Sequence, residues 1–192
     1  MADLFPGIPA GAGAGETNGP PADGGQPVNL LQHIDQQNSY AKNESSAGPM
    51  SNLFIGDSRL GCKSDADEQL IIHIAFREFV KIKAMKFVAF NNGVDPESNP
   101  SKVHLYVNRE NLGFEDCDDV DPQQTLHLTA EDLKEGADPI NLKYVLFQRV
   151  SSLTIFIEDN QGGEITAIGA LKLIGRSIVG TNMSDFKKQA ES

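Results

Sequence analysis

The chain has 192 residues, a length that can bury a core and that predicts one domain with a tail rather than two domains. Its 27 acidic and 16 basic side chains give a formal net charge of -11, which repels phosphate backbones and anionic lipid and argues against nucleic-acid and membrane-surface roles. Cys62 and Cys117 lie far apart in the sequence, so they indicate neither a disulfide framework nor a dithiol site and fit a reducing compartment.

The amino-terminal stretch is predicted to be a disordered leader. Residues 1–27 are mostly Gly, Ala and Pro and offer almost nothing to pack. The first residues lack both a basic segment and a continuous apolar segment, so they do not read as a secretion signal. No later apolar run approaches the about 20 residues that a membrane helix needs. We therefore expect a soluble protein inside the cell.

Ordered structure is expected to begin with a short helix and then to change to strands. Leu30, Leu31 and Ile34 recur at helical spacing, which predicts about two turns of helix over Val28–Ile34. After Ser64 the apolar residues alternate instead, which is typical of half-buried strands. The predicted strands span Leu70–Phe76, Val80–Phe90, Val103–Val107, Gln124–Leu128, Asn141–Phe147, Leu153–Ile157 and Ile168–Ile174.

One more helix, of about one or two turns, is predicted between the strands. Thr129 can cap it, Asp132 occupies the capping-box position three residues on, and Gly136 ends it. Many short strands with so little helix favour two packed antiparallel sheets. The predicted fold class is therefore all-β, a jelly-roll β-sandwich of about eight strands with short peripheral helices.

A first acidic cluster, Asp65, Asp67 and Glu68, directly precedes an apolar strand. A metal site needs more oxygen ligands than three neighbours offer, and the EF-hand pattern lacks its later Gly and Glu. A catalytic role needs carboxylates whose pKa values differ, and the sequence shows no buried partner for them. A turn capped by Ser and Asp side chains explains the cluster best. The main alternative is that the cluster forms an exposed rim that binds a partner.

A second acidic cluster, Glu115, Asp116, Asp118 and Asp119, surrounds Cys117 and is expected in a loop between strands. Such a run is usually a solvated face, and its alternatives are an electrostatic patch for a basic partner and a weak site for a divalent cation. Because neighbouring carboxylates disfavour a thiolate, we expect a raised pKa for Cys117 and no nucleophilic role.

The histidines do not indicate a zinc site by their spacing. His73, His104 and His127 each fall in a predicted strand, on the face opposite its main apolar set, where hydrogen-bonded surface or half-buried imidazoles are the usual outcome. The sequence also lacks a nucleophile elbow, a phosphate-binding loop and a His-Glu-x-x-His motif. We therefore expect a protein that is not an enzyme and holds no cofactor or metal.

The carboxyl end carries one candidate anchor pair, Met183 and Phe186, at helical spacing beside Lys187 and Lys188. Docking of this segment on its own sandwich is the first interpretation. Engagement of a partner is the second, because aromatic anchors flanked by charge are common at interfaces. Residues 189–192 are expected to form a flexible end.

Several motifs together resemble the PITH domain, the proteasome-interacting module attached to a thioredoxin domain in a thioredoxin-like protein. The resemblance covers roughly residues 28–188, and no thioredoxin domain precedes the module in this sequence, so the chain resembles the single-domain form. The motifs that carry it are Ser64–Leu70, Leu142–Val150, Ser152–Glu158 with Asn160-Gln161-Gly162, and Thr181–Lys188.

The resemblance implies a jelly-roll sandwich similar to galactose-binding domains and a monomeric, non-enzymatic interaction module that associates with the proteasome regulatory particle in cytosol and nucleus. The acidic loops and the tail are the candidate contacts: Asp65, Asp67, Glu68, Glu115, Asp116, Asp118, Asp119, Met183, Phe186, Lys187 and Lys188. A sandwich that binds a carbohydrate or another small ligand is the alternative, although the chain has no Trp and only three Tyr residues to stack on a sugar.

Overall fold

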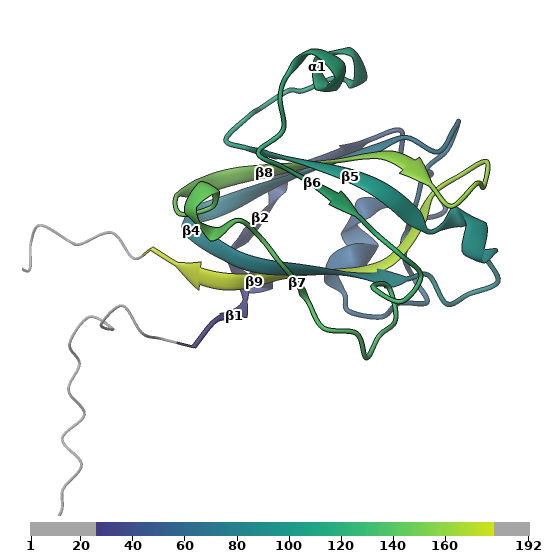
Figure 1. Cartoon of the computed structure of the whole chain (residues 1–192), viewed down its shortest axis with the longest axis horizontal. Helices are drawn as coiled ribbons and strands as arrows, with labels where there is room; N and C mark the ends of the chain where they lie inside the picture. Colours follow the sequence, from purple (N-terminus) through teal and green to yellow (C-terminus); the bar gives the residue numbers. More distant parts are fainter. Residues whose placement is uncertain (1–25, 179–192) are drawn as a thin grey trace, which may run out of the picture.

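The computed structural model describes residues 26–178 (Figure 1). Nearly all of the predicted leader lies outside the described residues, and so do the candidate tail contacts Met183, Phe186, Lys187 and Lys188.

Strands dominate the described part of the chain. Five short helices lie between them, and four of these have 3-10 geometry. The strands of residues 26–178 are β1 Val28–Asn29, β2 Ile34–Lys42, β3 Cys62–Lys63, β4 Leu70–Ala89, β5 Pro100–Val107, β6 Gln124–His127, β7 Ile140–Asn141, β8 Val150–Asn160 and β9 Ala167–Ser177. The helices are η1 Leu30–His33, η2 Met50–Phe54, η3 Pro96–Ser98, α1 Phe114–Asp119 and η4 Tyr144–Leu146.

The 20-residue strand β4 belongs to both layers of the sandwich. Its first half pairs with β2 on one side and with β8 on the other, and β8 continues to β5 and β6; we call this layer sheet one. Its second half pairs with β9 and β7, and β9 also pairs with β1 and β3; we call this layer sheet two. All pairings are antiparallel, and the pairing of β4 with β8 is interrupted between Ala75 and Val80, where β4 passes from one layer to the other.

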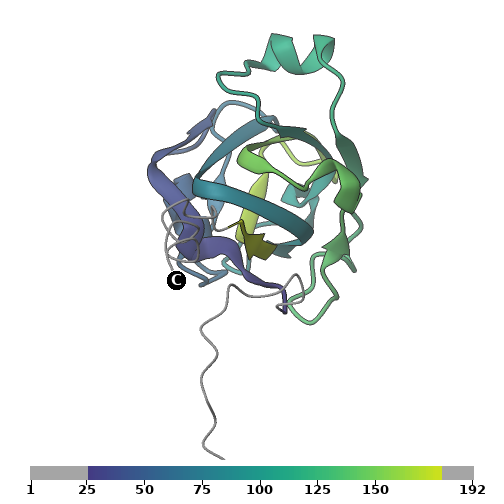
Figure 2. The same ribbon diagram turned by 90° about the vertical axis from the view of Figure 1, so that its left-hand side faces the viewer.

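The core lies between the two layers (Figure 2). Leu70, Ile72 and Ile74 point into it from the first half of β4, and Val80 and Ile82 from the second half, all fully buried. Each such side chain contributes roughly 1.5–3 kcal/mol on burial. The alternation that predicted the strands therefore marks the inner face correctly, and the predicted all-β sandwich is confirmed.

Two predictions about the first part of the chain were wrong in detail. The segment predicted as a helix over Val28–Ile34 contains one 3-10 turn, η1, between β1 and β2. Pairing of β1 with β9 and of β2 with β4 prevails there over the local helical spacing. The two strands predicted over Leu70–Phe76 and Val80–Phe90 are one strand, because β4 continues through its exposed charged residues Arg77 and Glu78.

Two predictions about the second part also need correction. The segment 129–136 forms turns instead of a helix. The Thr129 amide donates to Asp132 Oδ2 at 2.8 Å, as in one half of a capping box. The other half is missing, because the Thr129 hydroxyl also donates to Asp132 Oδ2, at 2.7 Å, and the Asp132 amide donates to the Thr129 carbonyl at 3.1 Å. Its one deeply buried side chain is Leu133, too little apolar surface to hold a helix. The strand predicted over Asn141–Phe147 is reduced to β7 and the 3-10 turn η4.

Within residues 26–178 no helix has the length and apolar composition needed to cross a bilayer.

Candidate functional site

The first acidic cluster forms a rigid turn at the start of β4. Asp67 Oδ1 accepts from the Gln69 amide at 3.1 Å and from Asn43 Nδ2 at 2.8 Å. Asn43 has a φ of 66°, a left-handed conformation that Asn tolerates better than most residues. The Thr166 hydroxyl closes the other side by donating to the Glu68 carbonyl at 2.6 Å. Asp65 and Asp67 remain exposed and Glu68 is partly exposed, so the turn presents carboxylates from a fixed backbone.

The second acidic cluster lies on the helix α1 and not in the loop that the sequence predicted. Asp116 Oδ2 accepts from the Gly113 amide at 2.7 Å and so begins the helix. Glu115, Asp118 and Asp119 are exposed. Lys42, the last residue of β2, and Asn43, which follows it, connect to the surroundings of the two clusters. Asn43 Nδ2 donates to Asp67, and Lys42 Nζ donates at 2.8 Å to the carbonyl of Leu112, two residues before α1.

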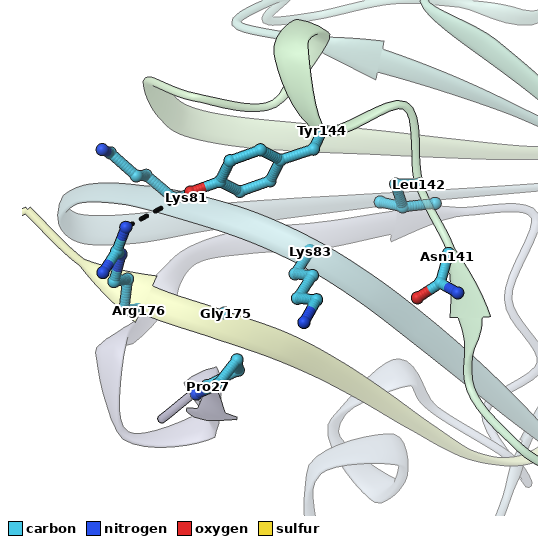
Figure 3. Close-up of a pocket in the computed structure, with 8 residues that line it drawn as sticks. All are labelled: Pro27, Lys81, Lys83, Asn141, Leu142, Tyr144, Gly175 and Arg176. Atoms are coloured by element: carbon cyan, nitrogen blue, oxygen red, sulfur yellow. Dashed lines mark hydrogen bonds between the residues drawn. The ribbon is translucent and has the colours of Figure 1, made fainter. Parts of the chain in front are cut away.

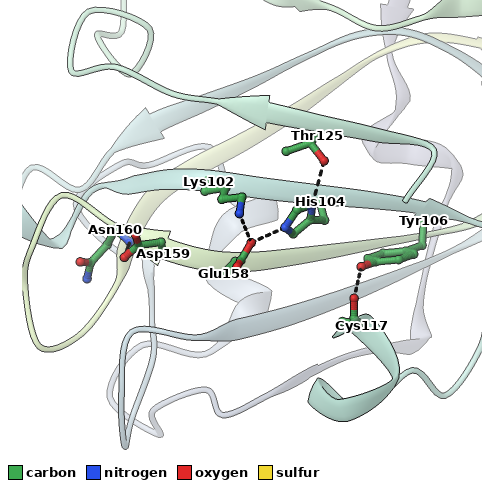
Figure 4. Close-up of polar contacts among 8 residues, drawn as sticks. All are labelled: Lys102, His104, Tyr106, Cys117, Thr125, Glu158, Asp159 and Asn160. Atoms are coloured by element: carbon green, nitrogen blue, oxygen red, sulfur yellow. Dashed lines mark hydrogen bonds and ion pairs between the residues drawn. The ribbon is translucent and has the colours of Figure 1, made fainter. Parts of the chain in front are cut away.

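Helix α1 covers part of the outer face of sheet one with a small second core (Figure 1). This cluster contains Ile71, Tyr106, Leu112, Cys117 and Phe156. The Tyr106 hydroxyl donates to the Cys117 carbonyl at 3.0 Å (Figure 4). Burial is the main cause that raises the pKa of the Cys117 thiol, and the carboxylates of Asp116 and Asp118 add to it, so the raised pKa expected from the sequence is confirmed with burial as the larger cause. Cys62 is fully buried, and burial raises its pKa to about 12.

A polar chain crosses β6, β5 and β8 beside α1 (Figure 4). His104 Nδ1 lies 2.8 Å from Thr125 Oγ1, and its Nε2 contacts Glu158 Oε2, which also accepts from Lys102 Nζ at 2.8 Å. Lys102 first, and His104 second, hold the pKa of Glu158 below its usual value. The ionised carboxylate therefore accepts a hydrogen bond from Nε2–H, and in the neutral imidazole Nδ1 accepts one from the threonine hydroxyl. The chain ties three strands together, and its imidazole is partly buried and hydrogen-bonded as the sequence predicted.

His73 occupies the other half of this outer face and is also hydrogen-bonded, but it is buried. Its ring stacks on Tyr40 with centroids 4.7 Å apart, and Nδ1 lies 2.9 Å from Thr154 Oγ1. The Thr154 hydroxyl donates its one proton to the Arg109 carbonyl at 3.0 Å, so His73 Nδ1 must carry the proton between them. Burial lowers the pKa of His73, which keeps the ring neutral near pH 7.

In the described part of the chain, no three His, Cys, Asp or Glu side chains lie close enough together to hold a metal ion.

The outer face of sheet two carries a pocket of about 590 Å³ (Figure 3). Lys81 and Lys83 line it from β4, Gly175 and Arg176 from β9, and Tyr144 from η4. Arg176 Nη2 donates to the Tyr144 hydroxyl at 3.4 Å, and this bond is the main cause that lowers the pKa of Tyr144. The lining is therefore cationic, on a chain whose net charge is strongly negative.

Apolar side chains lie exposed beside this pocket. Tyr144, Val145 and Leu146 of η4 are 38%, 81% and 44% exposed. Phe79 on β4 is 37% exposed, and the guanidinium of Arg149 lies 4.0 Å from the centre of its ring. Exposed aromatic and aliphatic residues next to cations are typical of surfaces that bind proteins.

The family model described as PITH domain matches residues 20–192 and therefore spans the whole described structure. The chain belongs to the PITH domain family.

Two relatives show how this PITH chain compares with longer proteins. It is 32% identical over 161 residues to Thioredoxin-like protein 1 of Schizosaccharomyces pombe, covering 82% of this chain and 52% of that protein. The chain thus spans about half the length of that relative. It is also 32% identical over 167 residues to PITH domain-containing protein 1 of Homo sapiens, covering 84% of this chain and 76% of that protein.

Solved structures similar to this PITH domain confirm the jelly-roll fold similar to galactose-binding domains. The CBM32-1 and CBM32-2 domains of Clostridium perfringens ZmpB, in complex with GalNAc, align with a TM-score of 0.59 at 10% identity, over 78% of this chain and 36% of that one. The family 32 CBM of C. perfringens NanJ, in complex with galactose, aligns with a TM-score of 0.52 at 8% identity, over 78% and 98%. At such identities the likeness extends to the fold alone.

The pocket of this PITH domain was not predicted from the sequence. Its lining comes from four segments that are separate in the sequence: Pro27, the second half of β4, residues 141–144, and Gly175 with Arg176 of β9. The segment that contains Tyr144 was predicted to be a strand. Two local signals could have indicated it. Phe79, Lys81 and Lys83 alternate with the buried residues of β4, and three large apolar residues follow one another in η4.

Proposed function

We propose that the protein is a non-enzymatic interaction module that associates with the regulatory particle of the proteasome in the cytosol and the nucleus. The observation that carries the proposal is the PITH family match over residues 20–192. The partner is the one implied by the sequence motifs at Ser64–Leu70, Leu142–Val150 and Ser152–Glu158.

Preformed acidic surfaces would suit this role. The Asp65–Glu68 turn is fixed by bonds from Asn43 and Thr166, and α1 is fixed by its cap and by the small core beneath it. Rigid segments lose little conformational entropy on binding. Their carboxylates would guide the encounter with a basic partner surface, and this attraction weakens with salt.

Purified 26S proteasome and the full chain provide the test. We expect the chain, immobilised through a tag, to retain the intact particle at low salt and to release it as the salt concentration rises. The variant with Met183→Ala and Phe186→Ala should bind several-fold more weakly if the tail contributes an anchor. A second variant, Asp118→Asn with Asp119→Asn, leaves the Asp116 cap intact and tests α1 alone.

The control is Glu131→Gln. Glu131 is an exposed carboxylate outside both acidic clusters, where it forms an ion pair with Lys134. It should bind as well as the wild type. Failure of purified proteasome to bind the wild-type chain at low or moderate salt would overturn the proposal, and so would equal loss of binding in the control.

Binding of a sugar stays a prediction. The galactose and GalNAc in the names of the similar structures belong to those proteins, and the likeness at 8–10% identity carries the fold only.

A further inference from the structure

We infer that the pocket on the outer face of sheet two docks an acidic peptide segment of a partner protein, with an apolar residue of that segment seated against η4. The inference does not depend on association with the proteasome, since it rests on the charge and shape of a surface lined by described residues of β4, η4 and β9 and not on the acidic clusters.

Cations converge on the pocket from separate strands. Lys81 and Arg176 are direct cross-strand neighbours of β4 and β9, and Lys83 follows two residues on along β4. Lys143, between the lining residues Leu142 and Tyr144, is exposed. A carboxylate entering the pocket would lie within reach of several positive charges, which gives charge-assisted hydrogen bonds.

The pKa of Tyr144 reflects the same positive charges. The pKa of its hydroxyl is lowered, first by the Arg176 hydrogen bond and also by the charges of Arg176 and Lys81. The same potential that favours a phenolate favours a carboxylate at that place.

The pocket also has exposed apolar residues next to it in the chain and a glycine in its lining. Val145 and Leu146, which follow the lining residue Tyr144, have 81% and 44% of their surface exposed. Gly175 carries no side chain, and a Cβ there would lie 1.9 Å from the Lys81 carbonyl oxygen, so the glycine keeps β9 close to β4. Asn141 adds an amide that can bond to a peptide group. A volume of about 590 Å³ fits one or two side chains of a short segment.

The net charge of the chain favours a short acidic peptide over larger polyanions. At -11, the protein as a whole repels nucleic acid and anionic bilayers at long range. A short segment carries few charges and engages the cations at close range, where local contacts exceed the screened repulsion. A flat bilayer also could not fill a concave pocket.

Fluorescence anisotropy with the full chain tests the inference. The probe is a labelled short peptide rich in Asp and Glu with one central Leu, and its matched partner carries Asn and Gln in place of the acids. We expect saturable binding of the acidic probe alone, weakened by salt. The variant Lys81→Gln with Lys83→Gln should bind roughly tenfold more weakly, as expected for the loss of charge-assisted contacts. Val145→Ser should weaken the binding of the acidic probe by a smaller factor.

The control variant is Lys134→Gln, an exposed lysine paired with Glu131 away from the pocket, and it should bind as the wild type does. Thermal unfolding of each variant shows whether the fold is retained. Equal binding of the Asn and Gln peptide, no saturable binding at low salt, or equal loss in Lys134→Gln would overturn the inference. A different anionic ligand would also overturn the inference. This would be the outcome if anionic vesicles, inorganic phosphate or an oligonucleotide bound to the wild type, lost binding in Lys81→Gln with Lys83→Gln, and the acidic peptide did not bind.

Discussion

The two outer faces of the sandwich are used in opposite ways. On sheet one, α1 buries Tyr106 and Phe156, and His73 and His104 are held in hydrogen bonds that link neighbouring strands. On sheet two, the corresponding face of the described residues carries a cationic pocket (Figure 3). Val145 and Leu146, which follow the lining residue Tyr144, are exposed. Helix α1 stabilises the fold on sheet one, whereas the pocket on sheet two is the surface inferred to receive an acidic segment.

The contrast also appears within one strand. Lys86 on β4 is buried, and its ammonium donates to the carbonyls of Lys134, at 2.7 Å, and of Ala137. Lys81 and Lys83, on the same strand, line the pocket instead. The turns at residues 130–137 thus cover one end of the outer face of sheet two and stop short of the other. The same residue type is a structural group at one end and a candidate binding group at the other.

Phe156→Ala is expected to have the largest effect. Phe156 is 1% exposed and lies beneath α1, so its loss leaves a cavity and should lower the free energy of unfolding by about 3–5 kcal/mol. Val145→Ala on the open face should change it by less than about 0.5 kcal/mol. Urea titrations measure both. Equal losses would mean that the two faces do not differ as described.

Lys86→Met is expected to have the second-largest effect on stability. The substitution removes the charged donor from two backbone carbonyls, and we expect a loss of roughly 1.5–3 kcal/mol in the free energy of unfolding. Lys83→Met, on the same strand but exposed, serves as the matched control and should stay within about 0.5 kcal/mol of the wild type. If Lys86→Met proved as mild as its control, the buried lysine would not hold the 130–137 turns in place.

His73 should make stability depend on pH. Because burial lowers its pKa in the folded state, the unfolded chain takes up the proton first as the pH falls. The contribution of His73 is therefore present above the usual histidine pKa of 6.5 and is lost progressively below it. Urea midpoints at pH 7.5 and 5.5, roughly one unit on either side of that value, measure the loss. We expect the two midpoints to differ less in His73→Asn than in the wild type.

Glu158→Gln is expected to have the smallest effect. The side chain is 34% exposed, so its pairs with Lys102 and His104 contribute at most about 1 kcal/mol near pH 7. Because the folded-state pKa of Glu158 is lowered, this contribution is present above the usual glutamate pKa of 4.5 and is lost as the pH falls below it. The melting temperature of the variant should match that of the wild type more closely at pH 3.5 than at pH 7, which lie roughly a unit or more from that value. A larger gap at the acidic pH would contradict this assignment.

Much of the fold could be predicted because its strands alternate. Leu70, Ile72 and Ile74 mark the inner face without any tertiary information. The failures are segments whose conformation depends on distant partners. Leu30 and Leu31 have helical spacing, yet the strand pairs on either side of them leave room for one turn only. Arg77 and Glu78 read as a break because the sequence does not show that β4 serves two sheets.

The candidate site was less predictable. The acidic clusters are local and were located directly, whereas the pocket joins residues of β4, η4 and β9. Its clearest signal was the apolar run Tyr144–Leu146, which reads as a strand until its exposure is known. Local patterns predict burial, but an exposed apolar residue is recognised only in the folded structure.

The central claim is that the acidic partner segment binds the pocket on the outer face of sheet two and not the outer face of sheet one. The most direct measurement is a titration of the ¹⁵N-labelled full chain with the acidic peptide, followed by amide chemical shifts. We predict shifts for Lys81, Lys83, Asn141, Tyr144 and Arg176 that saturate together, with His104 and Phe156 unchanged. Shifts centred on His104 and α1, or scattered shifts that do not saturate, would contradict the claim.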